Sequence, residues 1–254
     1  MSLAPAPTPD DHVREHLRTD IRDGVLTLTI NRPDAKNALT LAMRQHLEAL
    51  CAGIDADDTV SAVVLRATGS VFCAGADIKE IAAYGPGLPA TNPGAALRSV
   101  RKPVICAVGG ACVTGGLELA LSCDWIVASE QAFFADTHAR LGVLPRWGLS
   151  ALLPRTVGVR FAKEMSATGR RVNADEALRV GLVNAVVPHS DLDAYVLAQA
   201  TAAAAVPCAA LAATFALYDE GDGDTLTEAL AREHTRAAAW SPSGGPFSPG
   251  RTAG

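Results

Sequence analysis

Residues 101–128 read R-K-P-V-I-C-A-V-G-G-A-C-V-T-G-G-L-E-L-A-L-S-C-D-W-I-V-A and contain signals for a strand, a glycine turn and a helix in succession. Val104 to Val108 is a short apolar run rich in β-branched residues, which predicts a buried strand. After the glycine pair at 115 and 116, the apolar segment from Leu117 to Cys123 predicts a buried helix. Strand, glycine turn and helix in this order are typical of an α/β protein.

One charged side chain, Glu118, lies within the predicted helix, two residues after the glycine pair. The start of a helix carries unpaired backbone N–H groups, which can stabilise developing negative charge. Glu118 is therefore a candidate catalytic carboxylate. The alternative is a solvated helix face, because Ser122 lies four residues later on the same side of the helix. The glycine pattern does not fit G-x-G-x-x-G and lacks the Lys-Ser/Thr of a P-loop, so it predicts no nucleotide site.

The composition is that of a globular protein with a large core. Of its 254 residues, 49% are hydrophobic and 19% are charged. The net charge of -5 argues against a general nucleic-acid binder, but a local basic patch is enough to hold an anionic small ligand. No apolar run reaches the roughly 18 residues needed to span a bilayer. The six cysteines form no C-x-x-C pair, which argues against a zinc site and predicts reduced core residues of a cytoplasmic protein.

Strand and helix signals alternate over the first 190 residues, and helices follow. The expected organisation is a flexible arm over 1–19, an α/β core over 20–190, a helical region over 191–240 and a disordered tail over 241–254. Predicted strands cover 21–30, 62–66, 104–108, 124–128 and 182–187. Predicted helices cover 40–55, 95–100, 117–123, 148–156, 159–168 and 174–180, with Thr40, Asp77 and Asn173 as N-caps.

Four segments of the chain resemble the crotonase family of enoyl-CoA hydratases and isomerases, in the same order and at similar spacing. They are N-R-P-D-A-K-N-A-L (31–39), F-C-A-G-A-D-I-K-E (72–80), K-P-V-I-C-A-V-G-G-A-C-V-T-G-G-L-E-L-A-L-S-C-D (102–124) and A-L-R-V-G-L-V-N-A-V-V-P (177–188). The resemblance covers about residues 20 to 240. It implies an α/β spiral of ββα repeats with a helical C-terminal part, acyl-CoA thioester substrates of fatty acid β-oxidation, and no cofactor or metal.

The resemblance also implies that C-terminal helices assemble three chains, or two sets of three. The sequence adds its own argument for assembly. The alanine-rich segment from Val196 to Val206 carries little polar surface, so a monomer is expected to expose an apolar patch there. We therefore expect a homotrimer or a hexamer.

In crotonases, two backbone N–H groups form an oxyanion hole for the thioester carbonyl, and the resemblance assigns these to Ala76 and Gly115. The implied substrate-binding residues are Ala35, Lys36, Ala38, Ala74, Asp77 and Ile78. The candidate partners of the CoA phosphates are Lys36, Lys79, Arg101 and Lys102. For each of these four, an ordinary solvated side chain is the alternative.

Two glutamates flank the double bond in the hydratases, and the first corresponds to Glu118. The second position, counted with the G-x-x-P anchor at 142–145, holds His138. A Glu/His pair can move the two protons of a hydration because imidazole titrates near neutrality. The alternative is a surface histidine beside Asp136 and Arg140.

Two further departures from the family pattern lie close to these residues. The usual P-G-x-G-G is altered to P-R-W-G-L at 145–149, and the stretch before Arg101 looks shorter than in typical hydratases. The shorter stretch is expected to shape the acyl pocket.

The resemblance therefore implies an enoyl-CoA hydratase, a lyase that adds water across the 2,3 double bond of a 2-enoyl-CoA. Because His138 replaces a glutamate, two alternatives stay open. One is another acyl-CoA enzyme, an isomerase or a hydrolase, and the other is a non-catalytic acyl-CoA binder. A Rossmann-type dehydrogenase is disfavoured, since its glycine fingerprint is missing.

Overall fold

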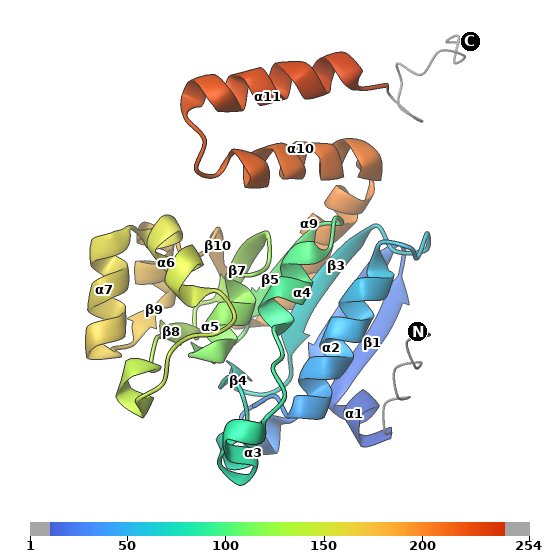
Figure 1. The fold of residues 1–254 in the computed structure, drawn as a ribbon. Helices are drawn as coiled ribbons and strands as arrows, with labels where there is room; N and C mark the ends of the chain where they lie inside the picture. The colour runs from blue at the N-terminus through green and yellow to red at the C-terminus, as the bar shows by residue number, and fades with distance from the viewer. Residues whose placement is uncertain (1–10, 242–254) are drawn as a thin grey trace.

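The computed structural model describes residues 11–241, which form two sheets with helices packed around them (Figure 1). The larger sheet has the strand order β1-β2-β3-β5-β7-β10. These strands are Leu17–Arg22, Val25–Ile30, Ala62–Ala67, Val104–Val108, Trp125–Ser129 and Ala185–Val187. Strand β1 is antiparallel to β2, and the other neighbours are parallel.

The smaller sheet has the strand order β4-β6-β8-β9. Its strands are Val71–Cys73, Ala111–Val113, Phe133–Ala135 and Val172–Asn173. The first three are parallel to one another, and β9 is antiparallel to β8.

The chain alternates between the two sheets. Each of the pairs β3-β4, β5-β6 and β7-β8 adds one strand to the larger sheet and the next to the smaller one. Helices follow each pair: α3 (Ile78–Tyr84) and α4 (Pro93–Ser99), then α5 (Gly115–Ala120), then α6 (Leu149–Val157) and α7 (Val159–Thr168). The predicted spiral of ββα turns is confirmed.

The central strands of the larger sheet, such as β5, are buried on both faces. Helix α9 (Leu192–Ala204) packs Val196 and Ala200 on one face, against Val64 and Ile105. Helix α2 (Leu41–Ile54) and α4 belong to the main core on the other face. A parallel strand covered on both sides is apolar along its whole length, which explains why 104–108 is recognisable as a strand.

The N-caps are where the sequence predicts them. Thr40 accepts a hydrogen bond from the backbone of α2, Asp77 caps α3 and Asn173 caps α8 (Ala174–Arg179). The remaining elements are α1 (Asp11–His16), α10 (Cys208–Gly221), α11 (Leu226–Ala239) and the 3-10 turns Pro33–Ala35, Gly85–Gly87, Ala139–Leu141 and His189–Asp191.

Several predicted boundaries differ from the structure. Within the described residues, α1 and the first part of β1 lie in the expected flexible arm, and the boundary expected at residue 20 falls inside β1. The helix expected over 117–123 begins and ends earlier, as α5. The predicted disorder of residues 1–10 and 242–254 lies outside the described residues.

The predicted exposed apolar patch from Val196 to Val206 is only partly present, because Val196 and Ala200 are covered by the sheet whereas Leu197 and Val206 are exposed. The helices that the sheets leave uncovered follow later in the chain. Helices α10 and α11 stand apart from the two sheets (Figure 1), and no described side chain in either is buried.

Among residues 11–241, no single helix is long and apolar enough to cross a membrane. The segments His189–Ala204 and Cys208–Gly221 meet the length and composition criteria only as a pair, and they are bent by 103°.

Candidate active site

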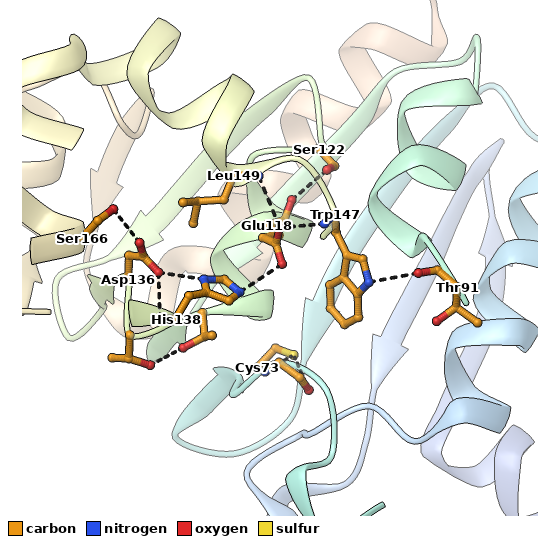
Figure 2. Close-up of polar contacts among 12 residues, drawn as sticks. Cys73, Thr91, Glu118, Ser122, Asp136, His138, Trp147, Leu149 and Ser166 are labelled. Carbon is orange, nitrogen blue, oxygen red and sulfur yellow. Dashed lines mark hydrogen bonds and ion pairs between the residues drawn. The ribbon is translucent and has the colours of Figure 1, made fainter. Parts of the chain in front are cut away.

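Three loops meet at one edge of the smaller sheet and form the candidate site (Figure 2). They follow β4, β6 and β8 at residues 74–77, 114–115 and 136–138. Because these strands are parallel neighbours, their carboxyl ends lie side by side. This arrangement brings together residues that are tens of positions apart in the sequence.

The N–H groups of Ala76 and Gly115 lie on two of these loops. Gly75 has φ +93°, and a Cβ built on it would lie 2.9 Å from the nitrogen of Gly115, so the two loops are in direct contact. Leu39 is hydrogen-bonded to the residues on either side of Ala76. Its N–H donates to the Gly75 oxygen (2.8 Å), and its carbonyl oxygen accepts from Asp77 N–H (2.9 Å). Within residues 11–241, neither Ala76 N–H nor Gly115 N–H donates a hydrogen bond. The pair is free to bind an oxyanion.

The backbone conformation of Thr114 positions the N–H group of Gly115 in the oxyanion hole. Its φ is 56°, an uncommon value for a β-branched residue. Its N–H donates to Ala135 oxygen at 3.0 Å, and its hydroxyl is hydrogen-bonded to that of Thr137. Both partners belong to the one segment at the end of β8, so this neighbouring segment holds the strained turn.

Glu118 is buried, with 2% of its surface exposed, so the alternative of a solvated helix face is wrong. Its Oε1 accepts hydrogen bonds from the backbone N–H groups of Trp147 (2.7 Å) and Leu149 (3.3 Å). The Ser122 hydroxyl donates to the Glu118 carbonyl oxygen at 2.7 Å. These contacts fix the carboxylate and leave Oε2 facing His138 (Figure 2).

His138 is buried between two carboxylates, so the alternative of a surface histidine is wrong. Its Nε2 lies 3.3 Å from Glu118 Oε2, and its Nδ1 lies 2.7 Å from Asp136 Oδ1. Burial alone would lower the pKa of His138. The hydrogen bond to Asp136 and the contact and charge of Glu118 outweigh it and raise the pKa of His138 to about 9.

Ser166, on α7, extends this row of polar groups. Its hydroxyl donates to Asp136 Oδ2 at 2.5 Å. Burial opposes ionisation of Asp136, but the hydrogen bonds from His138 and Ser166 hold its pKa below the usual value. The row Ser166–Asp136–His138–Glu118 therefore contains a proton donor, the imidazolium, in contact with a carboxylate that can accept a proton (Figure 2).

The two segments predicted to line the CoA path lie side by side. Ala74 N–H donates to the oxygen of Lys36 at 3.1 Å, which joins the segment with Ala35 and Ala38 to the segment with Ala74, Asp77 and Ile78. Lys36, Lys79 and Ile78 are exposed. Asp77 is engaged in the protein itself, because it pairs with Arg32 at 2.7 Å and caps α3.

Of the four candidate phosphate partners, Lys102 is buried in the protein, whereas Arg101 is exposed but paired with a carboxylate. Lys102 is 6% exposed, and its ammonium donates to the carbonyl oxygens of Ile54 and Asp57, each at 2.7 Å. Arg101 pairs with Asp55 at 3.0 Å. Both lie at the C-terminal end of α2, about 20 Å along the helix from the Lys36 side. Arg101 and Lys102 directly precede β5 in the sequence, but this does not bring their side chains to the site.

Ser166 and Trp147 contact the catalytic candidates, but the sequence gives them no role. Trp147 could have been noticed, because it lies in the altered P-R-W-G-L segment. Ser166 carries no signal in the sequence, since it reaches Asp136 from a different element through tertiary packing.

A cavity of about 560 Å³ lies elsewhere, between the start of β7 and α10. It is lined by Asp124, Trp125, Asn184, Gln199, Phe215, Tyr218 and Asp219. Burial raises the pKa of Asp124 to about 6. None of the candidate catalytic residues lines this cavity.

Within the described residues, no three His, Cys, Asp or Glu side chains are placed to hold a metal ion. All six cysteines are unpaired. Burial raises the pKa of the Cys51 and Cys73 thiols to about 12. The prediction that all six lie in the core is wrong for Cys208, which is exposed, and for Cys123, which is half-buried.

Comparisons with known proteins agree with this fold. The family model described as enoyl-CoA hydratase/isomerase matches residues 20–239. A probable peroxisomal enoyl-CoA hydratase 1 of Arabidopsis thaliana is 41% identical over 171 residues, which are 66% of this chain and 64% of that relative.

Solved structures extend the comparison. The crystal structure of an enoyl-CoA hydratase from Mycobacterium tuberculosis H37Rv is 44% identical, with TM-score 0.74, and covers 88% of this chain and 98% of its own. A putative enoyl-CoA hydratase from Streptomyces coelicolor A3(2) is 32% identical, with TM-score 0.84, over 94% of this chain and 90% of its own. On these grounds the chain belongs to the enoyl-CoA hydratase/isomerase, or crotonase, family.

Proposed function

We propose that the protein is an enoyl-CoA hydratase, a hydro-lyase that adds water across the 2,3 double bond of a 2-enoyl-CoA thioester. The observation that carries the proposal is the buried contact between Glu118 and His138, beside the free N–H groups of Ala76 and Gly115. The names of the relatives, which are called enoyl-CoA hydratases, support it.

The thioester carbonyl oxygen accepts hydrogen bonds from Ala76 and Gly115. As water attacks the β-carbon, negative charge develops on this oxygen, and the two N–H groups stabilise it. Loss of one such donor typically costs about 10²–10³-fold in rate. Gly115→Pro removes one donor and also places a Cβ 2.7 Å from the Trp147 ring, so it is expected to cost at least this much, provided that circular dichroism shows an intact fold.

Glu118 and His138 divide the proton transfers. Glu118 Oε2 takes one proton from the attacking water while the oxygen bonds to the β-carbon. His138 Nε2 gives its proton to the α-carbon, which converts the enolate into the saturated thioester. The proton on Glu118 then passes to His138 across their 3.3 Å contact, and both residues return to their starting forms. One water is consumed, with OH on the β-carbon and H on the α-carbon.

Acyl-CoA binding is assigned to Ala35, Lys36, Ala38, Ala74, Asp77 and Ile78, next to the oxyanion hole. Assembly as a homotrimer or a hexamer, a cytoplasmic location and a role in β-oxidation of fatty acids stay predictions. The name of the Arabidopsis relative places that protein in peroxisomes.

The test is hydration of crotonyl-CoA, followed by loss of the enoyl absorbance and by mass spectrometry of the product. The wild type is expected to form 3-hydroxybutyryl-CoA. Glu118→Gln should lose about 10²–10⁴-fold in kcat, the usual contribution of general acid–base catalysis. Migration of the double bond in a panel of enoyl-CoAs, release of free CoA, or binding without turnover would each contradict the proposal in favour of an isomerase, a hydrolase or a binder.

A further inference from the structure

We propose that Trp147 closes the acyl pocket behind the β-carbon and restricts the enzyme to short acyl chains. The inference rests on the proposed function, because it assigns a substrate class to the same site. It concerns a residue that follows the catalytic loops and takes no part in the proton transfers.

The indole ring lies directly against the oxyanion hole. A Cβ built on Gly115 would lie 2.7 Å from Cζ3 and 3.2 Å from Cε3 of Trp147. The ring therefore packs on the Cα of the residue whose N–H binds the thioester oxygen. A thioester held at Gly115 has the indole as its neighbour.

The same residue also contacts the catalytic carboxylate. Its backbone N–H donates to Glu118 Oε1 at 2.7 Å. Figure 2 shows His138 and Trp147 on opposite sides of Glu118. The α- and β-carbons lie between Gly115 and Glu118, so an acyl chain that continues beyond them meets the indole ring.

Trp147 is held in place by three hydrogen bonds, including the one to Glu118. Its Nε1 donates to the Thr91 carbonyl oxygen at 3.1 Å, and its own carbonyl oxygen accepts from Arg98 Nη1 at 3.0 Å. Gly94 packs so closely that a Cβ there would lie 2.5 Å from the Trp147 oxygen. The side chain is 5% exposed. Trp147 is therefore a fixed wall, and a longer acyl chain cannot displace it without breaking these contacts.

The experiment compares crotonyl-CoA with trans-2-octenoyl-CoA. The wild type is expected to favour crotonyl-CoA in kcat/KM by at least about 10-fold, since even one methylene in an apolar pocket is worth about that much. Trp147→Ala and Trp147→Leu should reduce this preference by about 10-fold or more. Trp147→Phe keeps an aromatic ring over Gly115 without the indole N–H, and should retain the preference for crotonyl-CoA. Equal use of both substrates by the wild type overturns the inference, as does an unchanged preference in a folded Ala or Leu variant.

Binding of the saturated thioesters butyryl-CoA and octanoyl-CoA, measured by calorimetry, separates the two proposals. If no hydration occurs but the binding preference shifts in the Trp147 variants, the acyl wall stands and the hydratase assignment fails. If hydration occurs and neither binding nor kcat/KM depends on Trp147, the proposed role of Trp147 in limiting chain length is wrong and the hydratase assignment stands.

Discussion

Replacement of the second glutamate by His138 removes the charge repulsion that two neighbouring carboxylates would experience. Two glutamates close together repel, so one of them must hold a proton. An imidazolium between Glu118 and Asp136 is attracted by both. With a pKa of about 9, His138 is charged at neutral pH and already carries the proton that hydration requires.

The first prediction at this scale concerns the rate. If the His138 imidazolium is the donor, kcat for crotonyl-CoA should fall as pH rises through about 9. His138→Ala should lose activity together with this pH dependence, and His138→Glu should keep hydrating because it restores a two-carboxylate site. An unchanged kcat and pH profile in His138→Ala would make His138 a bystander.

A second prediction concerns folding, with the sign set by the raised pKa. The ion pairs of His138 stabilise the folded chain fully below the ordinary value of 6.5, and this contribution is lost as pH rises through about 9. The difference in unfolding free energy between wild type and His138→Gln should therefore shrink from pH 6.5 to above 9. Denaturant titrations at several pH values measure it. A difference that stays constant with pH would contradict the raised pKa.

At the scale of elements, the contact between the loops after β4 and β6 sets the width of the oxyanion hole. Gly75→Ala would place a Cβ 2.9 Å from the nitrogen of Gly115 and force the loops apart. We expect a loss of about 10²–10³-fold in kcat, as for a lost donor. The left-handed backbone adds a folding cost of about 1–2 kcal/mol.

Gly158→Ala is the matched control for this change. Gly158 also has a positive φ, +80°, but a Cβ there meets nothing within 4 Å. It should show a similar loss of stability in thermal unfolding with near-normal kcat. Equal losses of activity in both variants would show that backbone strain, rather than the loop contact, is responsible.

The sequence predicts the elements of the larger sheet better than those of the smaller one. Strand β5 is five buried residues long, and its apolar run is visible. Strands β4, β6 and β8 have three residues each, too few for a period-two pattern to appear. The smaller sheet nevertheless aligns the loops of the site. Because its strands show no local pattern, the position of the site can be predicted only from the family resemblance.

The site residues divide in the same way. Glu118 stands out as a charge in an apolar helix, and His138 follows from counting along a family motif. Ser166 and Trp147 reach the site through tertiary contacts that no spacing in the sequence records.

At the scale of the whole molecule, α10 and α11 are incompletely packed in a single chain. Large apolar side chains on these helices and just after them are exposed, namely Tyr218, Leu226, Leu230 and Trp240. The cavity of about 560 Å³ separates part of α10 from the sheet. Uncovered apolar surface of this kind indicates a protein partner.

We therefore expect a trimer or a hexamer, with α10 and α11 in the contacts between chains. Light scattering at micromolar concentration should give three or six times the mass of one chain. The double variant Leu226→Lys, Leu230→Lys should shift the protein towards smaller species. Glu233→Lys in α11 is a control for added positive charge. A monomeric wild type would refute the assembly.

Strand β1 has a consequence for handling the protein at high concentration. It lies at the end of the larger sheet, and only its first residue is buried. Within residues 11–241, no strand pairs with its outer edge. An edge of this kind can recruit a strand from another molecule and start aggregation. Arg18, Asp20 and Arg22 alternate along it, and a strand docking there would have to accommodate these charges. We expect that replacing these three side chains with apolar residues would favour fibrous association.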